Sequence, residues 1–311
     1  MITKKAIFGM SFNWIFAIIA GGFILFIAIY GASKFIETSE ATLYTETAAA
    51  MISLLDPMET GLTSGKKPGE IEFTKESKLY FTCNERAFAP FGKQTIAFSE
   101  KTFGEKFGRK SERVDILDKY IFTEEIIQGK KLRHFSKPFF LTFKVADIVV
   151  FYFDDYCFYD TPEEIQEDIE GLNLDGIYFA NQSEKDLNCI KVCFKSQNDC
   201  DIKVAVSSNY VSKEGKRLYY TDDLLYAAIF SSPQIYECNI KRFKNKFNEL
   251  SKIHLTKIQV VKRKGCESNI ATKLSLMNSP LNSSRELLML YNQAEEVNLI
   301  NDAALSGCRI Y

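Results

Sequence analysis

The chain has 311 residues, of which 46% are hydrophobic and 14% aromatic, so it contains enough apolar surface for a packed core, which excludes wholesale disorder. Its 39 basic and 40 acidic residues almost cancel, and this balance argues against nucleic acid as a partner, because nucleic-acid phosphates select basic surfaces. The length accommodates a membrane anchor together with one large domain or two small ones.

The first predicted element is a transmembrane helix. Residues 6–32 contain no charged side chain, and a helix of that length spans roughly 40 Å, enough to cross a bilayer. Lys4 and Lys5 precede this segment, whereas Lys34 after it is followed by Glu37, Glu40 and Glu46. The positive-inside rule therefore predicts a single-pass protein of the cell membrane with a cytoplasmic N-terminus and an extracytoplasmic head.

Two further interpretations of this segment stay open. A secretory signal cleaved after Ala32 is the alternative to an anchor, although the apolar region of such signals is usually only about 7 to 15 residues long. Small residues recur at helical spacing at Ala17, Gly21 and Ala28, with Ile24 between them. This stripe favours self-association through the helix, and ordinary bilayer composition accounts for it equally well.

The helical pattern continues beyond the membrane. Residues 33–57 place Ile36, Leu43 and Met51 near one face and end at Pro57, since proline cannot continue a helix. We therefore expect one helix from about residue 6 to 55, with residues 1–32 as cytoplasmic N-terminus and membrane span and residues 33–57 as a stalk. Glycine, proline, serine and lysine in residues 58–69 then predict an exposed linker.

The head is predicted to be α+β, or mixed α/β, with a β-rich part over residues 70–145 and an α/β part over residues 146–311. Aromatic and β-branched residues, punctuated by glycine and proline, predict the strands of the first part. These strands are residues 70–73, 78–83, 94–100, 118–124, 131–135 and 139–145.

The α/β part begins with residues 147–153, an apolar run typical of a buried strand. A helix is predicted to follow, with Thr161 as N-cap, Pro162 in the first turn and Glu164 completing a capping box. Three short strands come next, at residues 176–180, 189–194 and 201–206. The polar loop between the last two predicts a hairpin.

Three helices are predicted in the C-terminal third. The first covers residues 222–230, and the second begins after the N-cap Ser232 and Pro233, with the basic run 241–246 on its solvated face. Ser283 and Glu286 form a capping box before the last helix. The apolar stripe that packs this helix on the head consists of Leu287, Leu290, Tyr291, Ala294 and Val297.

All eight cysteines follow the anchor: Cys83, Cys157, Cys189, Cys193, Cys200, Cys238, Cys266 and Cys308. An even number in an oxidising exterior predicts a disulfide framework. Cys193 and Cys200 flank the hairpin loop and are expected to pair, whereas Cys189 lies about 13 Å along the strand from Cys193 and needs another partner. Cys266 and Cys308 are the pair expected to hold the last helix.

The alternative for these cysteines is a zinc site, or eight reduced thiols if the head were cytosolic. No CxxC pair is present, and the chain has only two histidines, His134 and His254, so no metal site is predicted. Neither histidine lies near a nucleophile motif such as GxSxG, and glycine-rich phosphate loops are absent. No catalytic residue and no cofactor is therefore predicted.

Asp154 and Asp155 are the candidate ligand-binding residues, because they follow the buried strand 147–153 at its C-terminal end, where α/β folds place ligand groups. A polar loop between strand and helix is the alternative explanation. Asn181 and Asn282 begin glycosylation sequons, which fit a head outside the cell.

Several segments together resemble an uncharacterised group of archaeal single-pass membrane proteins with an N-terminal anchor and a cysteine-containing ectodomain. These segments are FNWIFAIIAGG, FSKPFFLTFKVADIVVF, DYCFYDTPEEI, DLLYAAIFSSPQIYEC and KGCESN. The resemblance implies an archaeal cell membrane and carries no activity with it. The long helix followed by a head is also similar in architecture to type IV pilins, although Gly9 is followed by no acidic residue before Glu37.

The sequence thus predicts a non-enzymatic surface protein whose head meets a protein partner or assembles with other subunits in a pilus-like way. A ligand-binding ectodomain and a membrane-tethered enzyme, both with their site at the end of strand 147–153, are the alternatives. The enzyme would need Asp154, Asp155, Cys157 and one histidine to meet in a cavity.

Overall fold

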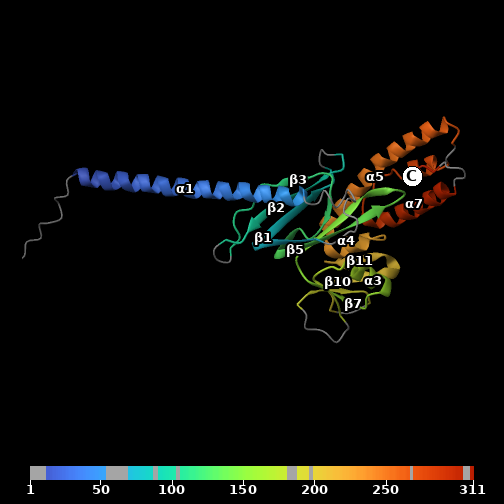
Figure 1. Ribbon diagram of the computed structural model, residues 1–311, viewed down its shortest axis with the longest axis horizontal. Helices are drawn as coiled ribbons and strands as arrows, with labels where there is room; N and C mark the ends of the chain where they lie inside the picture. The colour runs from blue at the N-terminus through green and yellow to red at the C-terminus, as the bar shows by residue number, and fades with distance from the viewer. Residues whose placement is uncertain are drawn as a thin grey trace, which may run out of the picture.

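The computed structural model describes residues 12–53, 69–86, 90–102, 106–180, 188–195, 199–266, 269–303 and 309–311. Its fold is mixed α+β, as predicted, with a long N-terminal helix, two mixed sheets and a C-terminal helix. In Figure 1 the N-terminal helix protrudes from one end of a head that holds all the strands, and the longest head helix extends from the other end.

Helix α1 (Phe12–Ser53) runs for 42 residues without a break, a length of about 63 Å. Its segment Trp14–Ile36 is long and apolar enough to cross a membrane, and the head covers none of it. The later part packs on the head, where Tyr44, Ala48 and Met51 are buried. The predicted anchor and stalk are thus one element, while the expected linker 58–69 falls almost wholly outside the described residues.

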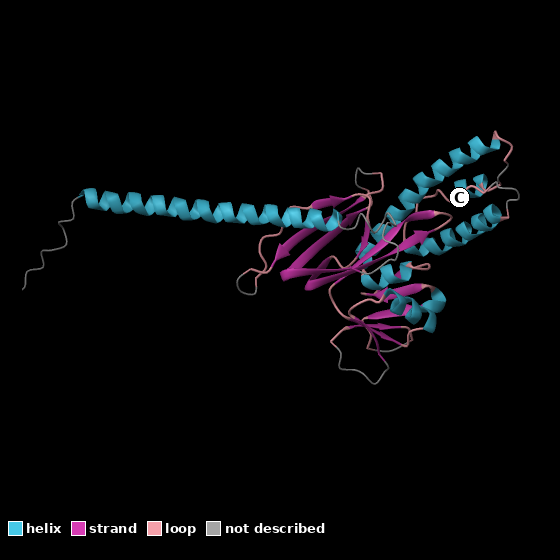
Figure 2. Cartoon of the chain, in the orientation of Figure 1, coloured by secondary structure: helices cyan, strands magenta, loops and turns pink. Residues whose placement is uncertain are grey.

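The first sheet has the strand order β3-β2-β1-β5-β6-β4. Its strands are β1 (Gly69–Asn84), β2 (Lys93–Glu100), β3 (Val114–Ile116), β4 (Tyr120–Phe122), β5 (Ile126–Phe140) and β6 (Lys144–Tyr152). All neighbours in it are antiparallel except β4 and β6. The stalk part of α1 lies along β2 and β3, at the edge of this sheet (Figure 2).

Strand β6 is buried on both faces because its residues are almost all apolar and β-branched or aromatic. Val149 and Phe151 point into the core that the stalk helix covers. Ile148 and Val150 point into the larger core formed with the helices and the second sheet. Residues 147–153, predicted as a strand that opens the α/β part, therefore complete the first sheet instead.

The second sheet has the order β12-β11-β10-β9-β7-β8. Its strands are β7 (Tyr156–Tyr159), β8 (Ile177–Ala180), β9 (Ile190–Cys193), β10 (Ile202–Ala205), β11 (Tyr210–Lys213) and β12 (Lys216–Tyr219). Helix α3 (Glu163–Leu172) connects β7 to β8, which pair in parallel. The crossover expected after strand 147–153 thus starts from β7, a strand that the sequence did not indicate.

The helices of the C-terminal part are α4 (Leu224–Phe230), α5 (Pro233–Lys262), α6 (Ala271–Leu276) and α7 (Leu287–Asp302), with short 3₁₀ turns at Val206–Ser208 and Ser284–Glu286. Ser232 caps α5 as predicted, since its side chain accepts the Ile235 N–H. The apolar stripe of α7 is confirmed at Leu287, Leu290, Ala294 and Val297, whereas Tyr291 is only partly buried.

Two predicted helix caps are wrong. Pro162 is the N-cap of α3, and the Thr161 hydroxyl is buried without a hydrogen-bond partner. Ser283 makes no side-chain cap, and the Glu286 carboxylate instead accepts the backbone N–H of Asn282. At α3 the helix begins after Pro162, and at α7 it begins after the 3₁₀ turn Ser284–Glu286. In both cases the helix starts later than predicted, so the hydroxyl of the expected cap does not face the free N–H groups of the first turn.

Two predictions about packing are also wrong. Strands β9 and β10 pair in parallel, so residues 189–206 do not form a hairpin. The basic run 241–246 does not lie wholly on a solvated face, because Arg242 and Lys244 are buried. Lys244 reaches the Asn248 side chain at 2.6 Å and the Met277 carbonyl, and Arg242 reaches carbonyl oxygens of the first sheet, so tertiary acceptors replace water for both charges.

Candidate functional site

Asp154 and Asp155 lie in the short connection between β6 and β7, where the chain passes from the first sheet to the second. The expected loop between strand and helix is therefore a connection between strands. Both residues line a cavity of about 630 Å³. The predicted site thus coincides with a hollow in the surface, at a position set by the junction of two sheets.

The rest of the cavity wall comes from turns far apart in the chain. Glu124 follows β4, Asp201 precedes β10, Lys213 ends β11, and Glu214 lies in the turn between β11 and β12. The disulfide-bonded Cys189 adds an apolar edge. Five carboxylates and one lysine thus face the same space, and the sequence offered no signal that these separate turns meet.

Asp155 is held in place by Arg133 of β5. The guanidinium Nη1 lies 3.0 Å from the Asp155 carboxylate and also donates to the Phe153 carbonyl at 2.8 Å. The Asp155 carbonyl in turn accepts the Ile190 N–H at 2.8 Å. Side chain and backbone of Asp155 therefore connect the first sheet to β9 of the second, and this residue has a structural role in addition to lining the cavity.

Lys213 is buried and does not present an open positive charge. Its ammonium group pairs with Glu124 and donates to the carbonyls of Ile229 at 3.1 Å and Ser231 at 3.3 Å. These contacts use its three donors. The carboxylates that remain open to the cavity are therefore not balanced by this lysine, and the cavity is negative.

Asp154 is exposed, as are Asp201 and Glu214 of the same cavity. The surrounding protein nevertheless desolvates Asp154 in part, which raises its pKa above 3.8, and the neighbouring Asp155 charge raises the pKa further against the opposing effect of Arg133. A cation bound in the cavity would favour the ionised form and lower this pKa. The cavity is suited to a cationic group.

The arrangement differs from a metal site. Among the described residues, no group of three or more histidine, cysteine, aspartate and glutamate side chains lies close enough to hold a metal ion. Spread carboxylates around a cavity of this size match an extended cation, such as an amine or the basic side chains of another protein, better than a compact ion.

The catalytic alternative required Cys157 and a histidine in the same cavity. Cys157 is bonded to Cys189, with Cα atoms 5.7 Å apart, and neither histidine lines the cavity. His134 packs on Phe151, and burial lowers its pKa. His254 stacks on Phe143 with ring centroids 4.3 Å apart. The Cys-His apparatus is therefore not formed.

The disulfide framework is formed at three pairs among the described cysteines: Cys83–Cys238, Cys157–Cys189 and Cys193–Cys200. The expected Cys193–Cys200 pair is present although its strands are parallel, and Cys189 has the other partner that its position required. Cys266 is also disulfide-bonded, and Cys308, its expected partner, lies outside the described residues.

The two predicted glycosylation positions differ in what the structure describes. Asn282 is exposed, and its side chain donates to Glu286 at 3.2 Å. Asn181 lies outside the described residues.

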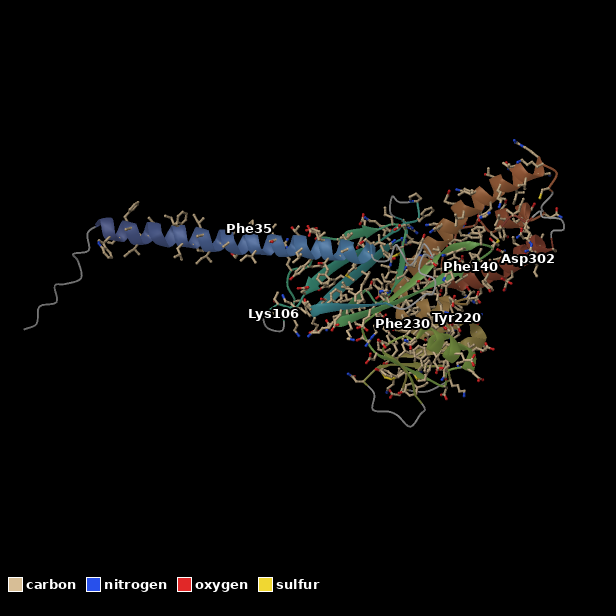
Figure 3. All side chains as sticks on the ribbon, in the orientation of Figure 1. Phe35, Lys106, Phe140, Tyr220, Phe230 and Asp302 are labelled. Carbon is tan, nitrogen blue, oxygen red and sulfur yellow. A yellow bond between two sulfur atoms is a disulfide. The ribbon has the colours of Figure 1, made fainter. Side chains whose placement is uncertain are left out.

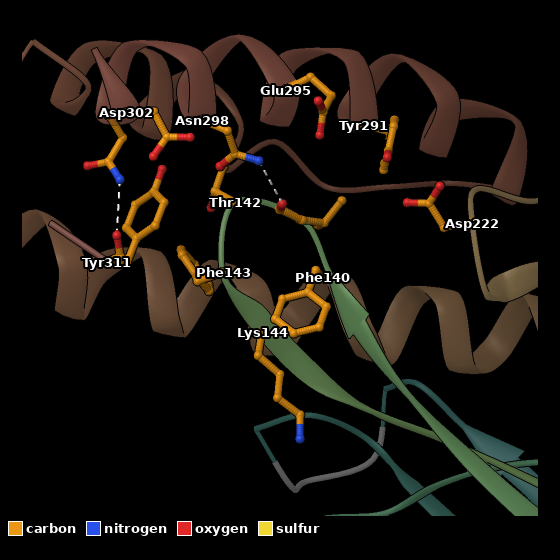
Figure 4. A pocket seen from close by; sticks show the side chains of 12 residues that line it. Phe140, Thr142, Phe143, Lys144, Asp222, Tyr291, Glu295, Asn298, Asp302 and Tyr311 are labelled. Atoms are coloured by element: carbon orange, nitrogen blue, oxygen red, sulfur yellow. Dashed lines mark hydrogen bonds between the residues drawn. The ribbon is translucent and has the colours of Figure 1, made fainter. Parts of the chain in front are cut away.

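A second cavity, of about 500 Å³, lies between α7 and the turn that joins β5 to β6 (Figure 4). The Asn298 side chain donates to the Leu141 carbonyl at 3.3 Å, and Asn301 donates to the Tyr311 carbonyl at 3.1 Å. Burial raises the pKa of the Tyr291 phenol in the wall of this cavity, and its hydrogen bond to Asp222 raises that pKa further. The sequence gave no indication of this cavity, because its wall joins the chain end to a turn more than a hundred residues earlier.

The chain matches no protein-family model, and comparisons with curated proteins and with solved structures find no match either.

Proposed function

We propose that the protein is a non-enzymatic, membrane-anchored surface protein whose extracytoplasmic head takes part in protein–protein interaction, either with a partner or with further copies of itself. The observation that supports this proposal most strongly is the course of helix α1. An apolar span that the head leaves uncovered continues without a break into the stalk that the head buries. The head is therefore attached to its anchor rigidly.

The arrangement supports assembly as well as anchoring. A protruding apolar helix whose later part packs on a mainly antiparallel sheet has the architecture of pilin-like subunits, which associate through such helices. The small-residue stripe around Gly21 lies on the exposed part of α1, and no described side chain of the head approaches that glycine. A neighbouring helix can approach the backbone there.

The cysteine chemistry supports an extracytoplasmic head. No cysteine among the described residues is free, and structural disulfides persist in oxidising compartments, whereas cytosolic thiols are kept reduced. The continuous helix through Ala32 supports an anchor that is kept over a signal that is removed, because the stalk is an extension of the span.

Membrane fractions from cells that express the full chain test this proposal. Carbonate at high pH should leave the protein in the pellet, and a protease added to intact cells should digest the head. For the association, cells carrying a photo-crosslinking residue at Gly21 should give a dimer or a partner adduct, and cells carrying it at Ile36 serve as the control. An extractable or protease-resistant head contradicts the anchor or its orientation, and no adduct at either position contradicts helix association.

A second candidate function is ligand binding by the ectodomain, favoured by the cavity that joins Asp154 and Asp155 to three further carboxylates. The ligand would be cationic. Isothermal titration with spermidine, as a probe amine, should show binding that is lost in the Asp154→Asn/Asp201→Asn variant. Asp223→Asn, outside the cavity, is the control. Equal binding by all three proteins would place the amine elsewhere.

A further inference from the structure

The end of the head that faces the protruding half of α1 carries a basic surface. Lys106 marks it in Figure 3, on the side nearest to the exposed helix and to Phe35. A cavity of about 540 Å³ lies beside it, between Tyr44 of the stalk and Lys75, Lys101 and Lys130 of the head. The anchor, the stalk and this group of lysines are thus neighbours in space.

The segment that carries Lys106 is ordered against the stalk. Lys101 and Phe107 pair as a β-bridge beyond the end of β2, and the Gly108 N–H donates to the Glu100 carbonyl at 2.8 Å. A β carbon at Gly108 would lie 3.6 Å from the Tyr44 hydroxyl. The position of Lys101 and Lys106 relative to α1 is therefore set by backbone pairing at the end of β2, the strand on which the stalk packs.

The charges of this end are predominantly positive. The described basic residues of segments 74–80, 100–113 and 128–130 are Lys75, Lys78, Lys101, Lys106, Arg109, Lys110, Arg113 and Lys130. The described acidic residues of these segments are Glu76, Glu100 and Glu112, and Glu72 of β1 and Glu46 of the stalk lie nearby. Glu76 pairs with Lys101 at 2.9 Å, and Glu100 lies 3.7 Å from Lys75. Since the carboxylates are fewer than the bases, a net positive charge remains for an external anion. The whole chain, in contrast, is almost neutral.

The height of this surface above the membrane follows from the helix. The candidate span ends at Ile36, and Tyr44 follows eight residues later, about 12 Å further along the axis. The headgroup layer is about 5 to 8 Å thick on each side of the hydrocarbon core, and a surface potential extends roughly 8 Å beyond it at physiological salt. The lysines around Tyr44 therefore lie within the range of the surface potential, and extended side chains there are long enough to approach the lipid phosphates.

We propose that this surface, centred on Lys75, Lys101, Lys106 and Lys130, binds the anionic lipid headgroups of the membrane that holds α1. The inference rests on the proposed membrane anchoring. The anchor keeps the surface at a high local concentration of lipid phosphate, so weak individual contacts suffice. Binding there sets the tilt of the rigid helix and head relative to the bilayer, and hence the direction in which the acidic cavity faces.

The test uses the full chain in nanodiscs of phosphatidylglycerol or of phosphatidylcholine, with lysine acylation followed by mass spectrometry. Lys106 and Lys130 should react several-fold more slowly in the anionic discs, and 1 M salt should abolish the difference because it shortens the screening length to about 3 Å. Lys262, exposed at the far end of α5, should react equally in both discs. Equal rates for Lys106 in both discs would overturn the proposal.

Further experiments distinguish lipid binding from binding of a soluble anion and from failure of the anchor. The Lys75→Gln/Lys106→Gln/Lys130→Gln variant should lose the protection of Lys101 in anionic discs, whereas Lys262→Gln should retain it. Protection by inorganic phosphate in phosphatidylcholine discs would assign the surface to a soluble anion and overturn the lipid proposal. Failure of the chain to enter either disc would contradict the anchor itself, whereas entry with unchanged labelling contradicts only the lipid contact.

Discussion

Arg242 is the side chain whose removal should damage the head most. It is fully buried in α5, and its guanidinium donates to the carbonyls of Phe91 at 3.1 Å, Leu117 at 3.0 Å and Lys119 at 3.1 Å. It also stacks over Tyr120, with Cζ 4.5 Å from the ring centroid. One side chain therefore satisfies carbonyl groups in two separate turns of the first sheet, the β1–β2 turn and the β3–β4 turn.

The Arg242→Ala variant leaves these carbonyl groups buried without a donor. Each unsatisfied group costs about 1–3 kcal/mol, and the relief of a buried charge offsets part of the sum, so we expect a loss of about 3–5 kcal/mol. In a head of this size, 1 kcal/mol corresponds to roughly 2–4 °C in Tm. The expected decrease is therefore about 6–20 °C. The Tm of Arg242→Lys should lie between those of the wild type and Arg242→Ala, because an ammonium group has three donors but lacks the planar fork of a guanidinium.

Thermal unfolding of the detergent-solubilised full chain, followed by circular dichroism, measures this effect. Lys241→Ala is the matched control, since Lys241 is the preceding residue and makes only a 3.5 Å surface ion pair with Glu85, worth under about 1 kcal/mol. A Tm for Arg242→Ala within 2 °C of the control would refute the assignment of Arg242 as the donor for these turns.

Three further predictions follow from the same geometry. Replacing the Cys83–Cys238 pair, whose residues are 155 apart in sequence, should lower the free energy of unfolding by about 5 kcal/mol. Replacing Cys193–Cys200, whose residues are 7 apart, should lower it by about 2.5 kcal/mol, because a disulfide that closes a longer loop removes more entropy from the unfolded chain. Equal losses of stability in urea unfolding would contradict this prediction. Ala48→Phe should overpack the buried contact between stalk and sheet and cost about 1–3 kcal/mol, while exposed Ala50→Phe should be neutral in the same assay. Burial raises the pKa of Asp154 in the folded state above its ordinary value, so the folded state binds this proton at a higher pH than the unfolded state does. The stability of the wild type relative to Asp154→Asn should therefore rise as pH falls through that raised pKa; a difference that is flat with pH would be the contrary result.

The elements that the sequence predicts best are those whose pattern lies within one continuous segment of the chain. Helix α1 shows a charge-free run followed by a helical stripe that Pro57 limits, and strand β6 shows a run of apolar, β-branched residues. Neither needs knowledge of a distant partner. The same patterns place Asp154 and Asp155 just after a buried strand, and this is why the residues of the candidate cavity that adjoin β6 could be identified.

The remaining features depend on contacts between distant parts of the chain. Arg242 resembles any other residue of a basic helix face until the carbonyl groups near Leu117 are placed beside it. Glu124, just after β4, and Lys213, at the end of β11, are 89 residues apart, and no local pattern shows that they meet. Strands β9 and β10 suggested a hairpin because parallel strands usually need a crossover of a dozen or more residues; here Cys193 and Cys200 close a much shorter connection.

The thiol count of the protein in native membranes tests the account most directly. Free cysteines are blocked in intact membranes, and the mass is measured without and then with prior reduction. An extracytoplasmic, disulfide-stabilised head predicts almost no blocked cysteine before reduction and eight after it. Eight blocked cysteines without reduction would contradict the proposed topology, and the head would then belong to the cytoplasm.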